Sequence, residues 1–415
     1  MKTRAGLREL TLMSASSITI IGTTAIAASL PEMLKRFAHI PHAQFLVGLA
    51  LTLPALAAGV CAPVMGAIVD RFGRKRLFLI ALAGYGTAGC AGAFLENLYA
   101  IMVSRFLLGI AVSGVATCAT VLISDYAKQG GLGKLMGRQS LFMALGNVMF
   151  VFTGGLLALA GWHWPFMIYS IGLLLIPAVV LLIDEPRAAP ADTTAASAAG
   201  AAEGTRPGPM RWSALGWVYF LLFLNMVIYF MVPVHLPFYL EQLTQGGSAQ
   251  AGAMLSLVGL SWAVSSAFYG RLERRLSHEQ IFVLTFAGSA AANVVLGLAS
   301  GYSLAIPALA LLGASLGLSI TNLNTWLFVL APAQAKGRVI GTRVFFTFIG
   351  QFLSPVLTSP LTSALGFGPG YVIAGCVLAV PVIGTQIHLL VRRAPQQPTA
   401  RTSTTNERSR RVGTP

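Results

Sequence analysis

The sequence predicts an all-α membrane protein with twelve transmembrane helices, arranged as two pseudo-symmetric six-helix bundles. Of its 415 residues, 55% are hydrophobic and only 10% are charged. A soluble domain carries about 25% charged residues, so this chain cannot cover itself with a water-facing surface. Apolar windows of roughly 20 residues, the length that crosses a bilayer, recur along the chain. They lie near residues 13–34, 44–69, 77–95, 99–124, 139–160, 164–183, 213–239, 249–269, 280–300, 303–331, 344–364 and 368–391.

The positive charges indicate the orientation. The chain has 28 Lys and Arg residues and a net charge of +15. With both termini in the cytoplasm, 25 of the 28 fall in cytoplasmic segments, against Lys35 and Arg36 outside and Arg105 within a span. This asymmetry follows the positive-inside rule and indicates a multi-pass protein, which we expect in a bacterial inner (plasma) membrane. The basic excess therefore faces anionic membrane lipids, and nucleic acid is not an expected partner.

Composition divides the spans six and six. Residues 184–212 are rich in Ala, Pro, Gly and Thr and have no apolar period, so we expect a cytoplasmic linker there. Before it we expect a cytoplasmic N-terminus over residues 1–12 and the first bundle over 13–183. After it we expect the second bundle over 213–391 and a disordered, basic cytoplasmic tail over 392–415.

An internal repeat supports this division. Shifting the sequence by 204 residues lays Gly109 on Gly313 and Gly146 on Gly350. A shift of 200 residues lays the basic stretch 270–275 on a similar stretch of the first half. Because six spans return the chain to its starting side, such halves are parallel copies related by an axis along the membrane normal.

A charged loop, "DRFGRKR" at residues 70–76, separates the second and third spans. Gly73 supplies the backbone freedom that a sharp turn needs, and Gly66 lets the end of the second span pack closely against a neighbour. The stretch GAIVDRFGRKR resembles the G-x-x-x-D-R-x-G-R-R/K-R/K signature of the major facilitator superfamily, at the place where that family carries it.

That resemblance implies the major facilitator fold for the whole chain. It also implies a charge and helix-dipole latch between this loop and the other half, which favours the outward-open state. The latch candidates are Gly66, Asp70, Arg71, Gly73, Arg74, Lys75 and Arg76. The second-half copy has Gly270 in place of the acid, so we expect the latch to be one-sided.

Arg105 lies deep in the apolar span 99–124. Burying it costs roughly 2.5–3.5 kcal/mol on insertion scales, so it should face a cavity or a partner, or else snorkel to the outer surface. Within the superfamily, the chain is closest in style to drug–proton antiporters of the Bcr/CflA-like type. These carry an arginine at this place that is linked to proton coupling, so the resemblance makes Arg105 a coupling candidate.

The acidic partner for such coupling is harder to place. The antiporters often carry an aspartate seven residues before a proline in the first span, where this chain has Thr24. Coupling could therefore run through Glu32, Asp70 or His235, or the protein could be an uncoupled facilitator. His235 is alternatively a packed residue beside a helix break at Pro233.

Polar and aromatic side chains at helical spacing are candidates for lining a substrate cavity. Polar side chains in a span avoid lipid, so they point inward, where they line a cavity or join helices. The cavity candidates are Thr19, Thr23, Asn147, Asn225, Tyr229, Asn322, Thr325 and Trp326. Aromatic side chains shape cavities for organic ligands, which favours Tyr229 and Trp326.

The hydrophilic parts of the sequence contain no nucleotide-binding loop, metal-ligand cluster or nucleophile–base pair, so we expect no cofactor, no metal and no enzyme. We expect a monomeric secondary active transporter that moves a small organic molecule by alternating access. The favoured interpretation is a proton-coupled exporter of a drug, a toxic compound or a secreted metabolite such as a siderophore. The alternatives are an importer or facilitator of a sugar or other metabolite, and a non-transporting membrane sensor, which would need an ordered soluble output domain.

Overall fold

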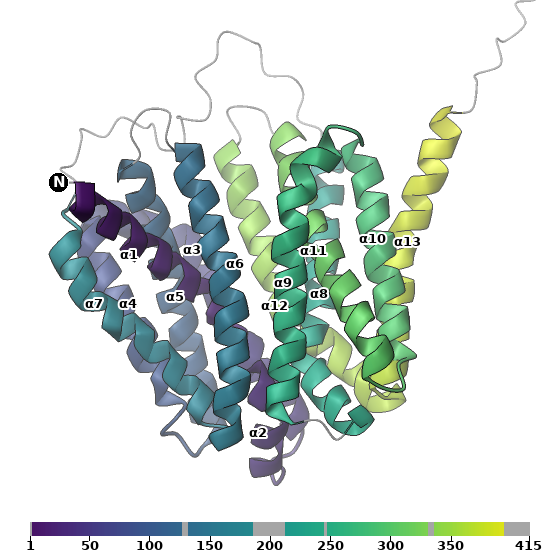
Figure 1. Cartoon of the computed structure of the whole chain (residues 1–415), viewed down its shortest axis with the longest axis horizontal. Coiled ribbons are helices and arrows are strands. Elements are labelled where there is room, and N and C mark those ends of the chain that lie inside the picture. Colours follow the sequence, from purple (N-terminus) through teal and green to yellow (C-terminus); the bar gives the residue numbers. More distant parts are fainter. Residues whose placement is uncertain (1, 127–131, 186–211, 245–246, 331–335, 394–415) are drawn as a thin grey trace, which may run out of the picture.

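The computed structural model describes residues 2–126, 132–185, 212–244, 247–330 and 336–393. Within those residues all regular secondary structure is helical, which confirms the predicted fold class (Figure 1). The first half contains α1 (Lys2–Ile21), η1 (Ala27–Ser29), α2 (Leu30–Arg36), α3 (Ala43–Phe72), α4 (Arg74–Ala91), α5 (Leu98–Tyr126), α6 (Leu132–Leu157), η2 (Ala158–Ala160), η3 (Trp164–Ser170) and α7 (Ile171–Leu182). The second half contains α8 (Trp212–Thr244), α9 (Ser248–Glu273), α10 (His278–Gly297), α11 (Tyr302–Leu330), α12 (Lys336–Leu365) and α13 (Phe367–Arg393).

The helices match the twelve expected spans. In the part of the chain that the structure describes, ten helical segments are long and apolar enough on their own to cross a membrane. The other two expected spans correspond to the segment from α1 through α2 and to α4. Both begin with basic residues, Lys2 and Arg4 in α1 and Arg74–Arg76 in α4, which lower the hydropathy of their first turns.

The helices form two bundles that pack in the same way. We call α1 through α7 the first bundle and α8 through α13 the second. A Cβ added to Gly109 of α5 would overlap the carbonyl oxygen of Pro54 in α3, and one added to Gly313 of α11 would overlap that of Val258 in α9. Both members of the second pair lie 204 residues after those of the first, so the sequence repeat is also a repeat of helix contacts. Figure 1 shows α6 and α9 side by side at the centre, with α7 and α13 at opposite ends.

The first span differs from the single apolar helix expected over residues 13–34. Helix α1 already begins at Lys2, so residues 2–12 continue into the span instead of preceding it. The helix then ends at Ile21, and the chain turns through residues 22–26 before η1 and α2. Pro31 lies in the first turn of α2, where its missing N–H leaves no intrahelical hydrogen bond unmade.

The helix break expected at Pro233 is wrong. Helix α8 runs from Trp212 to Thr244 with Pro233 and Pro237 inside it. Proline is tolerated in transmembrane helices because neighbouring helices compensate for the freed backbone groups. The predicted linker falls mostly on residues 186–211 and the predicted tail on residues 394–415, which lie outside the described residues.

We predict that Gly109→Ala and Gly313→Ala each destabilise the protein by about 1–3 kcal/mol, because the added methyl group forces two packed helix backbones apart. Gly216→Ala is the control, since a Cβ at this exposed position in α8 meets no described atom within 4 Å. Thermal unfolding of the purified variants in detergent measures the effect. Equal stability of all three variants would contradict the shared packing of the two bundles.

Candidate functional site

The candidate site lies between the bundles, and the molecule has two distinct ends. The basic face is the end of the helices that carries Arg8, Arg74, Arg138 and Arg271. The opposite face is the end that carries α2 and the start of α9 (Figure 1).

The bundles meet closely near the opposite face. A Cβ added to Gly155 of α6 would lie 2.7 Å from the Cα of Gly252 in α9. Small residues of this kind let two helix backbones approach in a membrane. On the same contact line, the Ser256 hydroxyl donates to the Val148 carbonyl at 3.2 Å.

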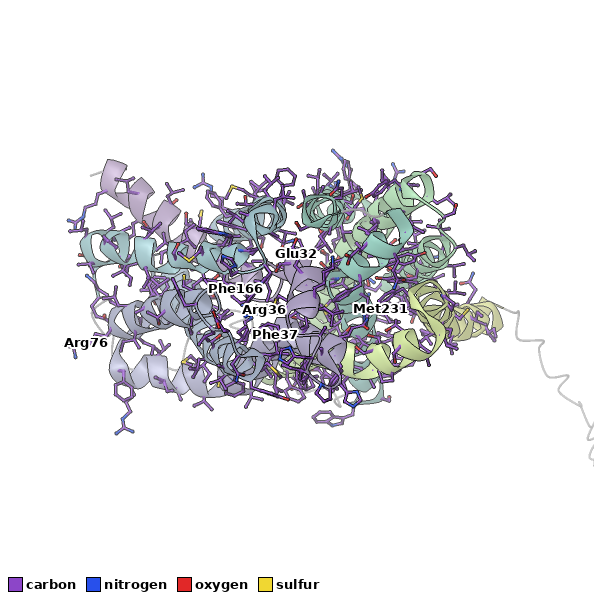
Figure 2. The ribbon with its side chains drawn as sticks, turned by 90° about the horizontal axis from the view of Figure 1, so that it is seen from below. Glu32, Arg36, Phe37, Arg76, Phe166 and Met231 are labelled. Atoms are coloured by element: carbon purple, nitrogen blue, oxygen red, sulfur yellow. The ribbon has the colours of Figure 1, made fainter. Side chains whose placement is uncertain are left out.

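An ion pair joins the bundles at the same end. Lys35 of α2 pairs with Glu241 of α8. Glu32 and these two residues line a small hollow between α2, α8 and α9. Figure 2, viewed from the side of α2, shows Glu32 between the two groups of helices. We call these contacts, Gly155–Gly252, Ser256–Val148 and Lys35–Glu241, the seal.

A second hollow between the bundles adjoins the seal, and we call it the interbundle hollow. It is lined by Thr24, Asn147, Val151, Tyr229, Val232, Pro233, Leu255 and Val258. The structure therefore brings together two of the predicted cavity residues, Asn147 from α6 and Tyr229 from α8. It adds Thr24, whose hydroxyl lies 3.3 Å from the Asn147 side-chain oxygen. Sequence reasoning identified Thr24 only as the position of the antiporters' aspartate and not as a cavity candidate, because it extended the helical register of α1 past its end.

The other two predicted residues of the first span make local contacts. The Thr19 hydroxyl donates to the Ser16 carbonyl at 2.7 Å, and the Thr23 hydroxyl donates to the Ile20 carbonyl at 3.3 Å. Neither lines the interbundle hollow. A substrate role for them stays a prediction.

Tyr229 also borders a hollow inside the second bundle. Asn225, Ser289 and Asn293 line this hollow together with apolar side chains. The Asn225 amide donates to the Ser319 hydroxyl at 3.0 Å. Tyr229 thus separates two cavities, one between the bundles and one within the second.

Asn322, Thr325 and Trp326 lie near the basic face, away from the interbundle hollow. The Asn322 amide donates to the His278 carbonyl at 2.9 Å, and its oxygen lies 3.0 Å from the His278 ring nitrogen. Trp326 stacks on the His278 ring, and the Thr325 hydroxyl donates to the Thr321 carbonyl. The contacts of Asn322 and Trp326 join α10 to α11, whereas the Thr325 hydrogen bond lies within α11. A cavity role for the three residues stays a prediction.

Arg105 is fully buried within the first bundle, so its side chain does not reach the outer surface. Its guanidinium donates to the carbonyl of Gly22 at 2.6 Å and to that of Ala50 at 3.3 Å. It also lies 5.1 Å from the centre of the Tyr169 ring. Gly22 directly follows the end of α1, so Arg105 places a positive charge at the negative end of that helix. No carboxylate whose side chain the structure describes forms an ion pair with it.

The remaining coupling candidates lie in different surroundings. His235 is buried in the second bundle, where its Nε2 lies 2.8 Å from the Thr358 hydroxyl and its ring packs on Phe367. Glu32 lies beside the seal. Their roles in coupling stay predictions.

The charged loop has its described partners in its own bundle. Gly73 has a φ of 89°, which favours glycine. The Glu185 carboxylate accepts from the Arg74 backbone N–H at 2.7 Å and from the Lys75 backbone N–H at 2.9 Å, which caps the start of α4. The Arg74 guanidinium pairs with Asp125 at the end of α5, and the Lys75 ammonium donates to the Val180 carbonyl at 2.8 Å.

The other latch candidates are less engaged. Arg71 and Arg76 are exposed, and Figure 2 shows Arg76 at the outer edge of the first bundle. A Cβ at Gly66 would meet no described atom within 4 Å, so the close packing expected there is absent from this conformation. The Asp70 side chain lies outside the described part of the structure. A latch to the second bundle stays a prediction for a state in which the basic face is closed.

Sequence reasoning did not identify Asp125 as the partner of Arg74. The carboxyl lies just beyond the apolar part of α5, and its pKa is raised because burial outweighs the opposing effect of Arg74. Its position at an inner helix end was visible in the sequence, but the pairing requires α4 and α5 to be adjacent.

Comparison with known proteins agrees with this architecture. The sequence profile of the Major Facilitator Superfamily matches residues 12–355. The class C tetracycline resistance protein of Escherichia coli is 24% identical, over 85% of this chain and 89% of that protein. The multi-drug resistance efflux pump PmrA of Streptococcus pneumoniae is 25% identical, over 78% and 81%. The inward-open structure of the xylose transporter XylE from E. coli matches with a TM-score of 0.73 and 15% identity, over 91% and 95%. The chain therefore belongs to the Major Facilitator Superfamily and is a multi-pass membrane transporter of small molecules, not an enzyme.

Proposed function

We propose that this protein is a proton-coupled exporter of a small organic molecule that works by alternating access in a bacterial inner membrane. The observation that carries the proposal is the interbundle hollow, which lies between two similarly packed bundles beside a seal at one face. The excess of Lys and Arg at the basic face favours a cytoplasmic location for that face and for both termini. The seal then closes the hollow from outside, as in an inward-facing state.

Contacts at the basic face are consistent with that state. Arg74 pairs with Asp125, Arg138 with Glu9, and the Arg343 guanidinium donates to Asn324. Each pair lies within a single bundle. The described basic side chains therefore leave the two bundles free to separate at this face.

The lining of the interbundle hollow indicates the chemistry of the substrate. It offers an amide, two hydroxyl groups and aromatic and aliphatic surface, and its lining residues include no ionisable acid or base apart from the tyrosine phenol. In this conformation the hollow measures only about 10 Å³, so the bundles must move apart before it can hold a substrate. Once widened, such a lining suits an uncharged, partly apolar organic molecule with hydrogen-bonding groups. The names of the tetracycline resistance protein and of the efflux pump PmrA favour export and a drug-like substrate.

Proton coupling needs a group that links protonation to the seal, and Glu32 is the best-placed candidate. Glu32 shares its hollow with Lys35 and Glu241, so one ammonium group faces two carboxylates. Protonation of Glu32 removes the repulsion between the carboxylates and leaves the Lys35–Glu241 pair balanced. External protons would thereby favour closure of the opposite face.

We predict that bridging Lys35→Cys and Glu241→Cys with a short bifunctional reagent stops export, because the opposite face can then no longer open. The cysteine pairs are introduced into a variant in which the four native cysteines, Cys61, Cys90, Cys118 and Cys376, have been replaced. Export is measured from loaded proteoliposomes before and after cleavage of the bridge, which should restore it. A bridge between Arg8→Cys and Asp184→Cys, an ion pair within the first bundle, should leave export unchanged. Export through a bridged seal would contradict alternating access.

Arg105→Gln is expected to lower the export rate about tenfold or more, since a charge-assisted hydrogen bond contributes roughly 1.5–3 kcal/mol. Arg105→Lys should retain part of the activity because it keeps the charge. Tyr85→Phe is the structural control: it removes a neighbouring hydrogen bond to the Ile18 carbonyl and should lower thermal stability without stopping export. Arg105 has only a structural role if two results are found together. The Arg105→Gln and Tyr85→Phe variants would have the same loss of thermal stability, and they would export at the same rate.

Everted membrane vesicles should accumulate a transported compound against its gradient, and a protonophore should abolish this accumulation. A growth screen in a strain without its own exporters supplies the compound. Glu32→Gln should lose uphill accumulation but keep downhill flux. Accumulation of the compound by intact cells instead of everted vesicles would identify an importer. Transport that is insensitive to the protonophore would identify a facilitator.

A further inference from the structure

A groove of about 640 Å³ lies at the basic face of the second bundle, away from the interbundle hollow. Its rim carries Arg271, Arg274 and Arg275 at the end of α9 and just beyond it. Its apolar part is formed by Phe268 of α9, Leu284 of α10 and Leu318 of α11. Three positive charges therefore border a pocket whose interior is hydrocarbon.

The apolar part faces the surroundings of the protein. Phe268 is 50% exposed and Leu284 is 52% exposed. Both side chains lie in helices that are long and apolar enough to span a membrane, so what they face there is lipid. The groove thus opens where acyl chains meet headgroups.

The three arginines have no internal anion among the described residues. The Arg271 guanidinium lies 5.2 Å from the centre of the Phe268 ring, and the Arg274 Nε donates to the Gly270 carbonyl at 3.1 Å. Glu273, the nearest acid in sequence, accepts a hydrogen bond from the Tyr269 hydroxyl. No described carboxylate forms an ion pair with Arg271, Arg274 or Arg275.

The equivalent loop of the first bundle contacts two acids from neighbouring segments. There Asp125 pairs with Arg74, and Glu185 caps the backbone of the following helix. The positions 204 residues after these two acids are Val329 and Leu389. The second bundle therefore keeps the basic residues of the repeat but has no acid at the positions equivalent to Asp125 and Glu185.

We propose that this groove binds one anionic phospholipid of the leaflet at the basic face. Its phosphate lies among the three guanidinium groups, which present donors in a fork that fits phosphate oxygens. One acyl chain lies along Phe268, Leu284 and Leu318. The proposal does not depend on the direction of transport or on the substrate.

The test is native mass spectrometry of the full-length protein in detergent, titrated with dioleoylphosphatidylglycerol or dioleoylphosphatidylcholine. The wild type should retain one phosphatidylglycerol about tenfold more tightly than phosphatidylcholine. Both lipids have an anionic phosphate, but the choline ammonium of phosphatidylcholine cancels that charge and is repelled by the three arginines, whereas phosphatidylglycerol has a net negative charge. Arg271→Gln/Arg275→Gln should abolish this preference, and Arg271→Lys/Arg275→Lys should keep most of it. The control Arg4→Gln/Arg138→Gln also removes two positive charges, but these arginines pair with internal acids. It should leave the preference for phosphatidylglycerol unchanged.

Two further arms separate a lipid from free phosphate. Leu284→Trp fills the apolar part of the groove without changing its charge and should weaken phosphatidylglycerol retention. Millimolar inorganic phosphate should not displace the lipid. Displacement by phosphate, equal retention of the two lipids, or unchanged retention in Arg271→Gln/Arg275→Gln would each overturn the proposal. Gel filtration verifies that every variant is folded.

Discussion

The bonds that hold the end of α1 set the position of much of the first bundle. A helix that stops inside a bilayer leaves carbonyl groups without partners, and there is no water to satisfy them. Tyr85 of α4 donates to the Ile18 carbonyl, Tyr169 of η3 to that of Ile21, and Arg105 of α5 to that of Gly22. Three neighbouring segments therefore converge on one helix end.

This arrangement positions both parts of the candidate site. Because α1 ends at Ile21, the following turn carries Thr24 to the interbundle hollow. The chain then continues through η1 into α2, which brings Lys35 to Glu241 of the second bundle. A continuous first helix would place neither residue where it lies. The charge of Arg105 is thus coupled structurally to the hollow and to the seal.

The two bundles have equivalent helix contacts but different charged and polar side chains. The sequence predicted the features that depend on local hydropathy and on the repeat, and did not predict those that depend on contacts between distant residues. Hydropathy predicted the spans, because the bilayer acts on local sequence directly. The 204-residue spacing predicted the repeat of Gly109 and Gly313, and the structure adds that both glycines make equivalent helix contacts. The break after Ile21 could not be predicted, since part of what satisfies it, Arg105, is more than 80 residues away in the chain. Asn322 shows the other limit: a polar residue that points inward can bond to a neighbouring helix instead of lining a cavity.

The strengths of contacts within and between bundles differ in a way that suits the proposed exchange of states. Helices in lipid have no hydrophobic drive to associate, so close packing and buried polar bonds hold them together. Within the first bundle, buried donors bind the end of α1; within the second, Asn225 bonds to Ser319. Across the seal, Lys35 is 68% exposed and Glu241 37% exposed, and pairs of this kind contribute about 0–1 kcal/mol. Opening the seal therefore requires separating Gly155 from Gly252 and breaking the Ser256–Val148 hydrogen bond, while the exposed ion pair adds little. A ligand that binds one state more tightly by a few kcal/mol shifts the population between the two states.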